Sequence, residues 1–224
     1  MRIGILLPTF EVGARHAFEV AAQAAEAGLD GVFAYDHLWP MGSPARPALA
    51  PFPVLAAVLA RHESLTVGPL VARIGLLPST TLIESLRTLE ALGPGRVVAA
   101  LGTGDRLSAA ENEAYGLGVA SASQRREELG HVARVLGPEM PVWVGAGSPA
   151  TNELARRVGA TLNLWNATPE QVAAARAEGP VSWAGPVPAH LELTLDRLES
   201  AGATWAVLSP HASVAALGAW RAGR

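Results

Sequence analysis

Short apolar segments alternate with longer amphipathic segments along the whole chain. The apolar segments are rich in Val, Leu and Ile without strict polar alternation, which is typical of strands buried on both faces. The pattern predicts eight strands, at 2–7, 31–35, 66–72, 97–101, 141–145, 161–165, 180–184 and 204–208. It predicts a helix after each strand, at 14–27, 51–61, 80–92, 122–136, 149–158, 169–178, 188–201 and 212–221.

Signals at the helix ends support this alternation. Thr168 and Gln171 have the spacing of a capping box, and Pro169 stands at the first helical position between them. Glycines that favour the left-handed conformation needed at a helix end occur where helices should stop, at 28, 93, 159 and 202.

Eight strand–helix units are the count of a closed parallel (β/α)8 barrel, the TIM barrel. The 224 residues are enough for one such domain over 1–224, with little room for insertions. An open doubly wound sheet is the alternative. It would place a G-x-G-x-x-G turn after the first strand, where this chain has PTFEVG at 8–13.

Two motifs lie at strand ends, where barrel enzymes carry their active sites. Asp36 and His37 follow the second strand, and Gly102-Thr103-Gly104-Asp105 follows the fourth. A histidine exchanges protons near neutral pH, and a partly buried aspartate can serve as a general acid. The structural alternative is a pair of ordinary turns with solvated aspartates. The position at the barrel mouth favours a catalytic interpretation.

A third segment, Gly145-Ala146-Gly147-Ser148-Pro149, opens the helix after strand five. Backbone N–H groups at a helix N-terminus can hold a phosphate, although a plain capped helix start has the same residues. Three tryptophans near strand carboxyl ends, at 39, 165 and 183, are candidates to line a substrate pocket for a planar ligand. We interpret Trp143, Trp205 and Trp220 as packing residues.

Composition excludes several functions. The net charge is −3 and no basic patch is present, which argues against nucleic-acid binding. The chain has no cysteine, and its histidines lack metal-ligand spacing, so we expect no metal site. Neither a signal peptide nor a membrane-length apolar run is visible, so a cytoplasmic protein is the default expectation.

Several segments in order resemble one family. They are MRIGILLP, AAQAAEAGLDGVFAYDHL, TLIESLRTLEALGPGRVVAALGTGD, ENEAYG, PVWVGAGSPATNELARRVGA, LNLW and LESAGATWAVLSP. Together they resemble the bacterial luciferase-like oxidoreductases, in the branch that uses the deazaflavin coenzyme F420.

The resemblance implies a deazaflavin or flavin across the barrel mouth. Asp36 and His37 match the family pair that contacts the ring and its reacting face, and Asp105 matches the acid after the Gly-x-Gly turn that contains Gly104. Gly147 and Ser148 match the phosphate grip. A backbone bulge that supports the ring is implied near Leu70, Val71 and Ala72.

The chain departs from the family pattern in two places. Ala160-Thr161 stands where Asp-Gly is common, and a long late insertion that covers the substrate is missing, because a helix follows Trp183-Ala184-Gly185 almost directly.

Three hypotheses follow. The first is hydride transfer between F420 and a small organic substrate, with His37 and Asp105 handling the proton. The second is an FMN-dependent monooxygenase, and the third is a non-catalytic trimmed barrel that serves as a binding or assembly module. The resemblance and the alanine-rich helices at 14–27 and 51–61 imply a homodimer.

Overall fold

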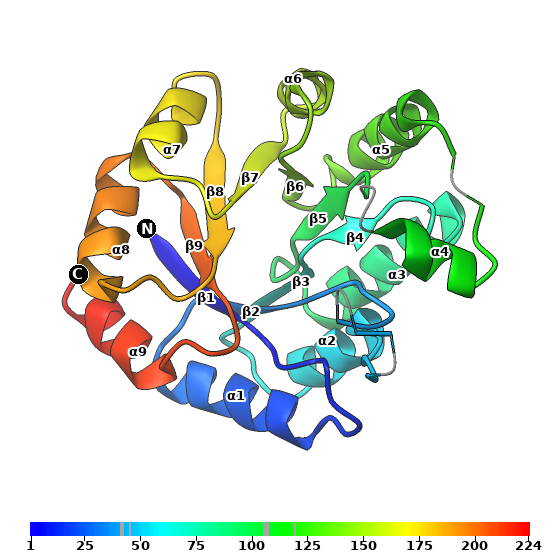
Figure 1. Ribbon diagram of the computed structural model, residues 1–224. Coiled ribbons are helices and arrows are strands. Elements are labelled where there is room, and N and C mark those ends of the chain that lie inside the picture. Colours follow the sequence, from blue (N-terminus) through cyan, green and yellow to red (C-terminus); the bar gives the residue numbers. More distant parts are fainter. Residues whose placement is uncertain (41–42, 45, 105–107, 119) are drawn as a thin grey trace.

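The computed structural model describes residues 1–40, 43–44, 46–104, 108–118 and 120–224. Its strands form one parallel sheet that is ringed by helices (Figure 1). The described strands are β1 (Arg2–Leu6), β2 (Gly31–Ala34), β3 (Thr66–Pro69), β4 (Ala72–Arg73), β5 (Ala99–Gly102), β6 (Val142–Gly145), β7 (Thr161–Trp165), β8 (Val181–Gly185) and β9 (Trp205–Leu208).

The helices follow the strands as the pattern predicted. They are α1 (Arg15–Glu26), α2 (Pro51–Leu59), α3 (Ser79–Leu92), α4 (Ala109–Ala114), α5 (Ala122–Leu136), α6 (Pro149–Arg157), α7 (Pro169–Arg176), α8 (Leu191–Ser200) and α9 (Val214–Ala222). The predicted capping box at Thr168 is confirmed: its side chain accepts the N–H of Gln171, and the Gln171 side chain accepts the N–H of Thr168. The sequence pattern missed α4, which lies in the segment expected to be a loop.

The sheet closes into a barrel. The strand order is β3-β2-β1-β9-β8-β7-β6-β5-β4, so the first strand lies beside the last, as expected for a TIM barrel. The remaining gap is closed at Val67, which pairs with Val97 in a parallel bridge; the Val67 N–H donates to the Arg96 carbonyl at 2.8 Å. The open-sheet alternative is therefore wrong.

The third predicted strand, 66–72, is two strands in the structure. β3 ends at Pro69 and pairs with β2, whereas β4 begins at Ala72 and pairs with β5. Leu70 and Val71 lie between them and are joined by a cis peptide bond. The interruption falls at the residues named for the expected bulge.

Aromatic side chains fill the barrel interior. Phe33 stacks on Trp143 at 5.3 Å between ring centroids and meets Trp205 edge-on at 5.6 Å. A Cβ on Gly4 or Gly68 would contact the Phe33 ring at 3.0 or 3.3 Å, so glycine at these positions leaves room for it. The barrel is therefore a packed core below its mouth, and Trp143 and Trp205 have the packing role inferred for them.

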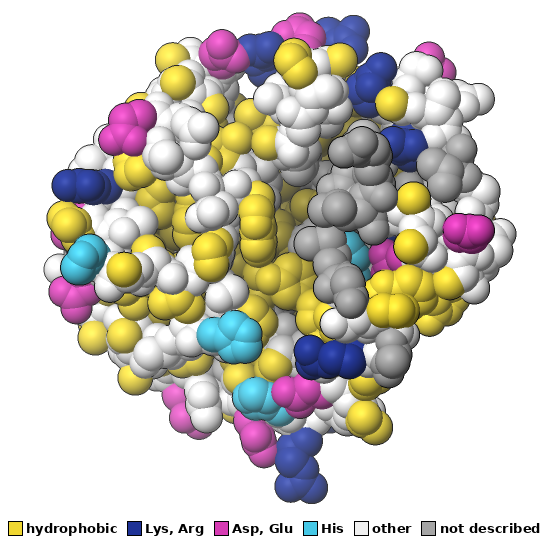
Figure 2. Space-filling model, viewed as in Figure 1, with side chains coloured by type: hydrophobic (Ala, Val, Ile, Leu, Met, Phe, Trp, Pro, Cys, Tyr) yellow, Lys and Arg dark blue, Asp and Glu magenta, His cyan; other side chains and the backbone are white. Residues whose placement is uncertain are grey.

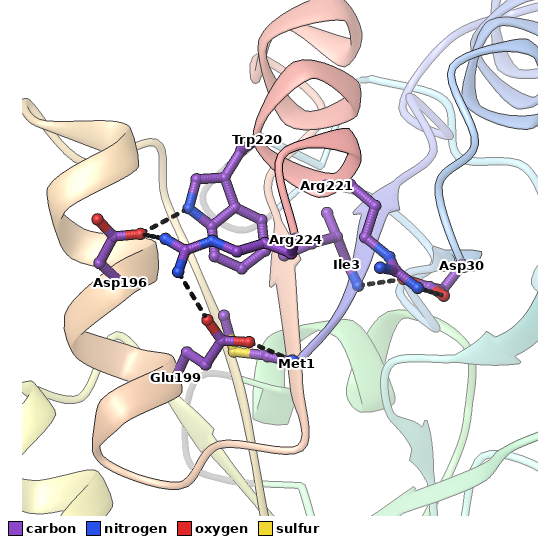
Figure 3. A network of polar contacts seen from close by, with 8 residues as sticks. All are labelled: Met1, Ile3, Asp30, Asp196, Glu199, Trp220, Arg221 and Arg224. Carbon is purple, nitrogen blue, oxygen red and sulfur yellow. Dashed lines mark hydrogen bonds and ion pairs between the residues drawn. The ribbon is translucent and has the colours of Figure 1, made fainter.

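Asp30 fastens the first strand to the last helix at the entrance of β2 (Figure 3). Its Oδ2 accepts the N–H of Ile3 at 2.8 Å and the Nε–H of Arg221 at 2.9 Å. The amino group of Met1 also pairs with Glu199 of α8 at 2.5 Å. These contacts join the start of β1 to α8 and α9, the last two helices. They lie at the amino ends of the strands, opposite the barrel mouth.

Within the described part of the chain, no helix is long and apolar enough to cross a membrane. The same residues contain no cluster of three or more His, Asp or Glu side chains able to hold a metal ion.

Candidate functional site

A cavity of about 390 Å³ opens at the carboxyl ends of the strands. Its lining comes from the last residues of β4, β5, β6 and β7 and from the segments that follow β2, β3, β5 and β6. The lining residues are Tyr35, Asp36, His37, Leu70, Val71, Arg73, Gly102, Thr103, Gly104, Ser108, Gly145, Ala146, Gly147 and Trp165. Figure 2 shows hydrophobic side chains gathered in a hollow at the centre of the ring of helices.

The structure brings most of the sequence-predicted site residues to this one cavity. Those that line it are Asp36, His37, Leu70, Val71, Gly104, Gly147 and Trp165. They come from strands that are far apart in the sequence, and only closure of the barrel brings them together. Asp105 lies outside the described residues.

Four of the candidate residues do not line the cavity. Ala72 and Trp183 are buried in the larger of the two hydrophobic clusters of the protein. The Nε1–H of Trp183 donates to the Ala167 carbonyl at 2.9 Å. Ser148 caps α6 through the N–H of Thr151. The Trp39 ring lies 5.6 Å from that of Tyr115 and is not among the residues that line the cavity.

Glu111 of α4 connects three parts of the site through hydrogen bonds. It is only 2% exposed, and its Oε1 accepts the backbone N–H of Leu38. Its Oε2 lies 2.7 Å from Nη1 of Arg73 and 3.2 Å from Nδ1 of His37. One carboxylate therefore sets the position of the loop after β2, the imidazole and the guanidinium.

Glu111 is charged in this setting. Burial by itself would raise the pKa of this carboxyl, but hydrogen bonds from Leu38 and Arg73, with the Arg73 charge, hold the pKa below its usual value. A carboxylate accepts hydrogen bonds only, so Nδ1 of His37 carries a proton towards it. In the neutral imidazole this leaves Nε2 as the acceptor.

Asp36 holds the backbone of Arg73. Its Oδ2 accepts the backbone N–H of Arg73 at 2.8 Å, and the residue is 8% exposed. Burial raises the pKa of Asp36, although the N–H and the charge of Arg73 act in the other direction. Asp36 thus anchors β4 to the end of β2.

Aromatic rings form one wall of the cavity. Tyr35 lies 6.4 Å from Trp165 and stacks on Phe10 at 5.3 Å between centroids. Burial raises the pKa of Tyr35 to about 12, so its phenol stays protonated. Trp165 is 53% exposed, which is unusual for so large an apolar side chain and suits a surface that meets a flat ligand.

The glycine turn after β5 makes room for the segment that contains the cis bond. A Cβ on Gly102 would collide with Val71, and a Cβ on Gly104 would lie 2.9 Å from Cδ of Arg73. Gly104 also has φ 66°, in the left-handed region that favours glycine. The turn therefore positions Arg73 as well as leaving backbone open at the cavity.

The N-terminus of α6 lies at the edge of the cavity. The Gly147 N–H donates to Oδ1 of Asn152 at 3.0 Å, and the Thr151 N–H donates to Oγ of Ser148 at 3.3 Å. A phosphate at the predicted position would have to replace Asn152 as the acceptor for Gly147. The grip at Gly147 and Ser148 stays a prediction.

A second hollow of about 630 Å³ lies between α6 and α7 and shares Ala146, Gly147 and Trp165 with the cavity. The two cavities are therefore neighbours at the segment after β6 and at the end of β7.

Besides Ser108 in the cavity lining, sequence reasoning missed three residues on which the site depends, namely Tyr35, Arg73 and Glu111. Each stood beside a residue or motif already singled out: Tyr35 before Asp36, Arg73 after Ala72, and Glu111 in ENEAYG. No local pattern indicated that Glu111 reaches His37, which is 74 positions away in the chain.

Comparisons with known proteins agree with this fold. A family model described as luciferase-like monooxygenase matches residues 1–137. An F420-dependent glucose-6-phosphate dehydrogenase of Nakamurella multipartita is 29% identical over 70% of this chain and 54% of its own length. The enzyme of the same name from Microbacterium testaceum is 26% identical over the same shares. The chain thus spans about half the length of these curated relatives.

Solved structures share the fold. An F420-dependent secondary alcohol dehydrogenase, in complex with an F420–acetone adduct, superposes with a TM-score of 0.76 at 15% identity, over 93% of this chain and 92% of that one. Monooxygenase RslO1 from Streptomyces bottropensis gives 0.76 at 15% identity, over 100% of this chain and 98% of that one.

We predict that Glu111→Gln destabilises the protein in a pH-dependent way. Because the folded-state pKa of Glu111 is lowered, its charge contributes stability above its usual pKa of 4.5, and this contribution disappears as the pH falls through the folded-state value. At pH 7 we expect a loss of about 3 kcal/mol, typical of breaking a buried ion pair. Urea unfolding from pH 3 to 8 measures it, with exposed Glu63→Gln as control. An equal loss at every pH would contradict the assignment.

Gly104→Ala and Gly116→Ala form a matched pair. Their φ angles are 66° and 67°, but an added Cβ at Gly116 meets nothing within 4 Å, whereas at Gly104 it meets Arg73. We expect Gly116→Ala to lower the free energy of unfolding by about 1–2 kcal/mol, the cost of the left-handed conformation. Gly104→Ala should lower it further. Denaturant unfolding of both variants compares them, and equal losses would show that Arg73 yields freely.

Proposed function

The chain belongs to the luciferase-like monooxygenase family, and from this we propose that it is an oxidoreductase that transfers a hydride between coenzyme F420 and a small organic substrate. The curated relatives are named as F420-dependent dehydrogenases, which supports this cofactor. The observation that carries the proposal is His37, which lines the cavity at the barrel mouth while Glu111 holds its Nδ1.

The residues at the cavity fit a flat, partly polar ring system. Tyr35 and Trp165 offer aromatic surface, and Leu70 and Val71 offer an apolar backing from the segment between β3 and β4. Gly147, with Ser148 beside it, would receive the phosphate end, at the N-terminus of α6. When bound there, F420 supplies the centre that accepts or releases the hydride, and the protein supplies position and proton transfer.

His37 would hold or move the proton at Nε2. Glu111 engages Nδ1, so Nε2 is the ring nitrogen left for a substrate oxygen. A hydroxyl substrate that loses a hydride must also lose its hydroxyl proton, and Nε2 would accept it. In the reverse direction the imidazolium would return that proton. Asp105, the residue after Gly104 in the sequence, is proposed as the second proton-handling residue.

An FMN-dependent monooxygenase is the second candidate, and the family description and the likeness to monooxygenase RslO1 favour it. Absorbance titration of the purified protein with F420 and with FMN decides between them. We expect saturable binding of F420 and weaker binding of FMN. Tighter binding of FMN would transfer the proposal to the monooxygenase, and no binding of either would favour the non-catalytic module.

Replacing His37 should separate chemistry from cofactor binding. We expect His37→Ala to keep its affinity for the cofactor but to lose about 10²–10⁴-fold in turnover, the usual contribution of a general base. Propan-2-ol and glucose 6-phosphate are the first substrates to test, with bleaching of the oxidised cofactor as the readout. His16→Ala is the control, because His16 is exposed and pairs with Glu11 away from the cavity. Full turnover by His37→Ala would refute this role.

We also propose that the chain forms a homodimer. Helix α2 carries no charged residue and exposes Pro53, and Val12, just before α1, is 90% exposed; these apolar positions support the proposal. Sedimentation at micromolar concentration should show twice the mass of the chain, and a monomer would refute the proposal.

A further inference from the structure

Arg73 lines the cavity and is a buried cation with two donors that have no acceptor among the described residues. The residue is 5% exposed and lines the cavity, and its Nη1–H donates to Glu111 at 2.7 Å. Its Nε and Nη2 are buried, and neither has a hydrogen-bond partner among the residues that the structure describes. Buried donors without acceptors are costly and rare in native proteins, so this pair calls for an acceptor.

The two unused donors lie on one edge of the guanidinium. In arginine, the Nε–H and one Nη2–H point in the same direction, which matches the two oxygens of a carboxylate in a planar, bidentate pair. Glu111 does not use this edge, because its bond to Arg73 is made to Nη1, and its oxygens otherwise accept from Leu38 and His37.

The guanidinium is also held in place. Its aliphatic stem packs against Gly104, where an added Cβ would lie 2.9 Å from Cδ. The backbone N–H of Arg73 is bonded to Asp36, and Nη1 is bonded to Glu111. A side chain fixed at these three points loses little further freedom when a ligand binds, which favours affinity.

We propose that the Nε–Nη2 edge of Arg73 is a carboxylate-binding point inside the cavity, and that the substrate is a small organic acid whose acidic group docks there while its reacting carbon faces His37. Tyr35, Leu70, Val71 and Trp165 would surround the apolar body of such a molecule. The choice of substrate rests on the proposed function, whereas the carboxylate-binding point itself does not.

The test uses benzoate and benzamide, which share shape and differ in charge, with the cofactor-free protein in a calorimetric titration. We expect wild type to bind benzoate at least about tenfold more tightly than benzamide, the size of a charged hydrogen bond. Arg73→Lys keeps the positive charge but lacks the planar fork, and it should lose most of that preference. Arg61→Lys is the control, because Arg61 is exposed and lies just after α2, where it donates to the Ala57 carbonyl of that helix.

Three results would each overturn the proposal: equal binding of benzoate and benzamide, no binding of benzoate, or an unchanged preference for benzoate in Arg73→Lys. A repeat with protein saturated in F420 or FMN identifies the source of the acid. If benzoate still binds, the site serves the substrate. If benzoate is excluded and Arg73→Lys weakens cofactor binding, the edge holds an acidic group of the cofactor, and the organic-acid substrate is refuted. If neither F420 nor FMN binds in the absorbance titration, the proposed function fails, but the benzoate result still tests the carboxylate-binding point. The two proposals can therefore fail independently.

Discussion

The site depends on one buried carboxylate. Glu111 reaches from α4 into the barrel mouth and accepts hydrogen bonds from the loop after β2 and from β4. Its own burial is unfavourable for a charge, and the cation and the backbone N–H that it engages offset that cost. Without Glu111, no shared hydrogen-bond acceptor would fix the imidazole of His37 relative to the guanidinium of Arg73. Arg73 would then be a buried cation without an ion-pair partner among the described residues.

The segment between β3 and β4 is the second constraint. It turns the chain from pairing with β2 to pairing with β5, and in doing so it directs Val71 and Arg73 towards the cavity. The glycines of the next turn are needed because these side chains occupy the space that a Cβ would take. Gly102 and Gly104 therefore accommodate the protein's own side chains, Val71 and Arg73.

Below the mouth, the barrel supplies rigidity. The rings of Phe33, Trp143 and Trp205 fill the interior, and Asp30 ties β1 to α9 at the far end. Packing and chemistry are therefore separated along the barrel axis. Large apolar side chains occupy the middle of the strands, and polar side chains follow the strand ends, where backbone and side chains can reach a ligand.

The sequence by itself determined the alternation of strands and helices, the closure of a parallel barrel and the strand ends at which Asp36, His37, Gly104 and Gly147 lie. The alternation and the strand ends depend on local periodicity and on turn residues, which short windows contain, and the closed barrel was inferred from the number of strand–helix units. The roles of those residues in binding and catalysis stay predictions.

Only the tertiary structure decided which side chains meet. Glu111 and His37 lie 74 positions apart, and Trp165 faces the cavity while Trp183, on the neighbouring strand, turns into the core. The division of 66–72 into two strands depends on β2 and β5, which lie on either side of it in space. A contact between distant segments has no local signature, because it is selected by the packing of the closed barrel rather than by the residues on either side of it in the chain.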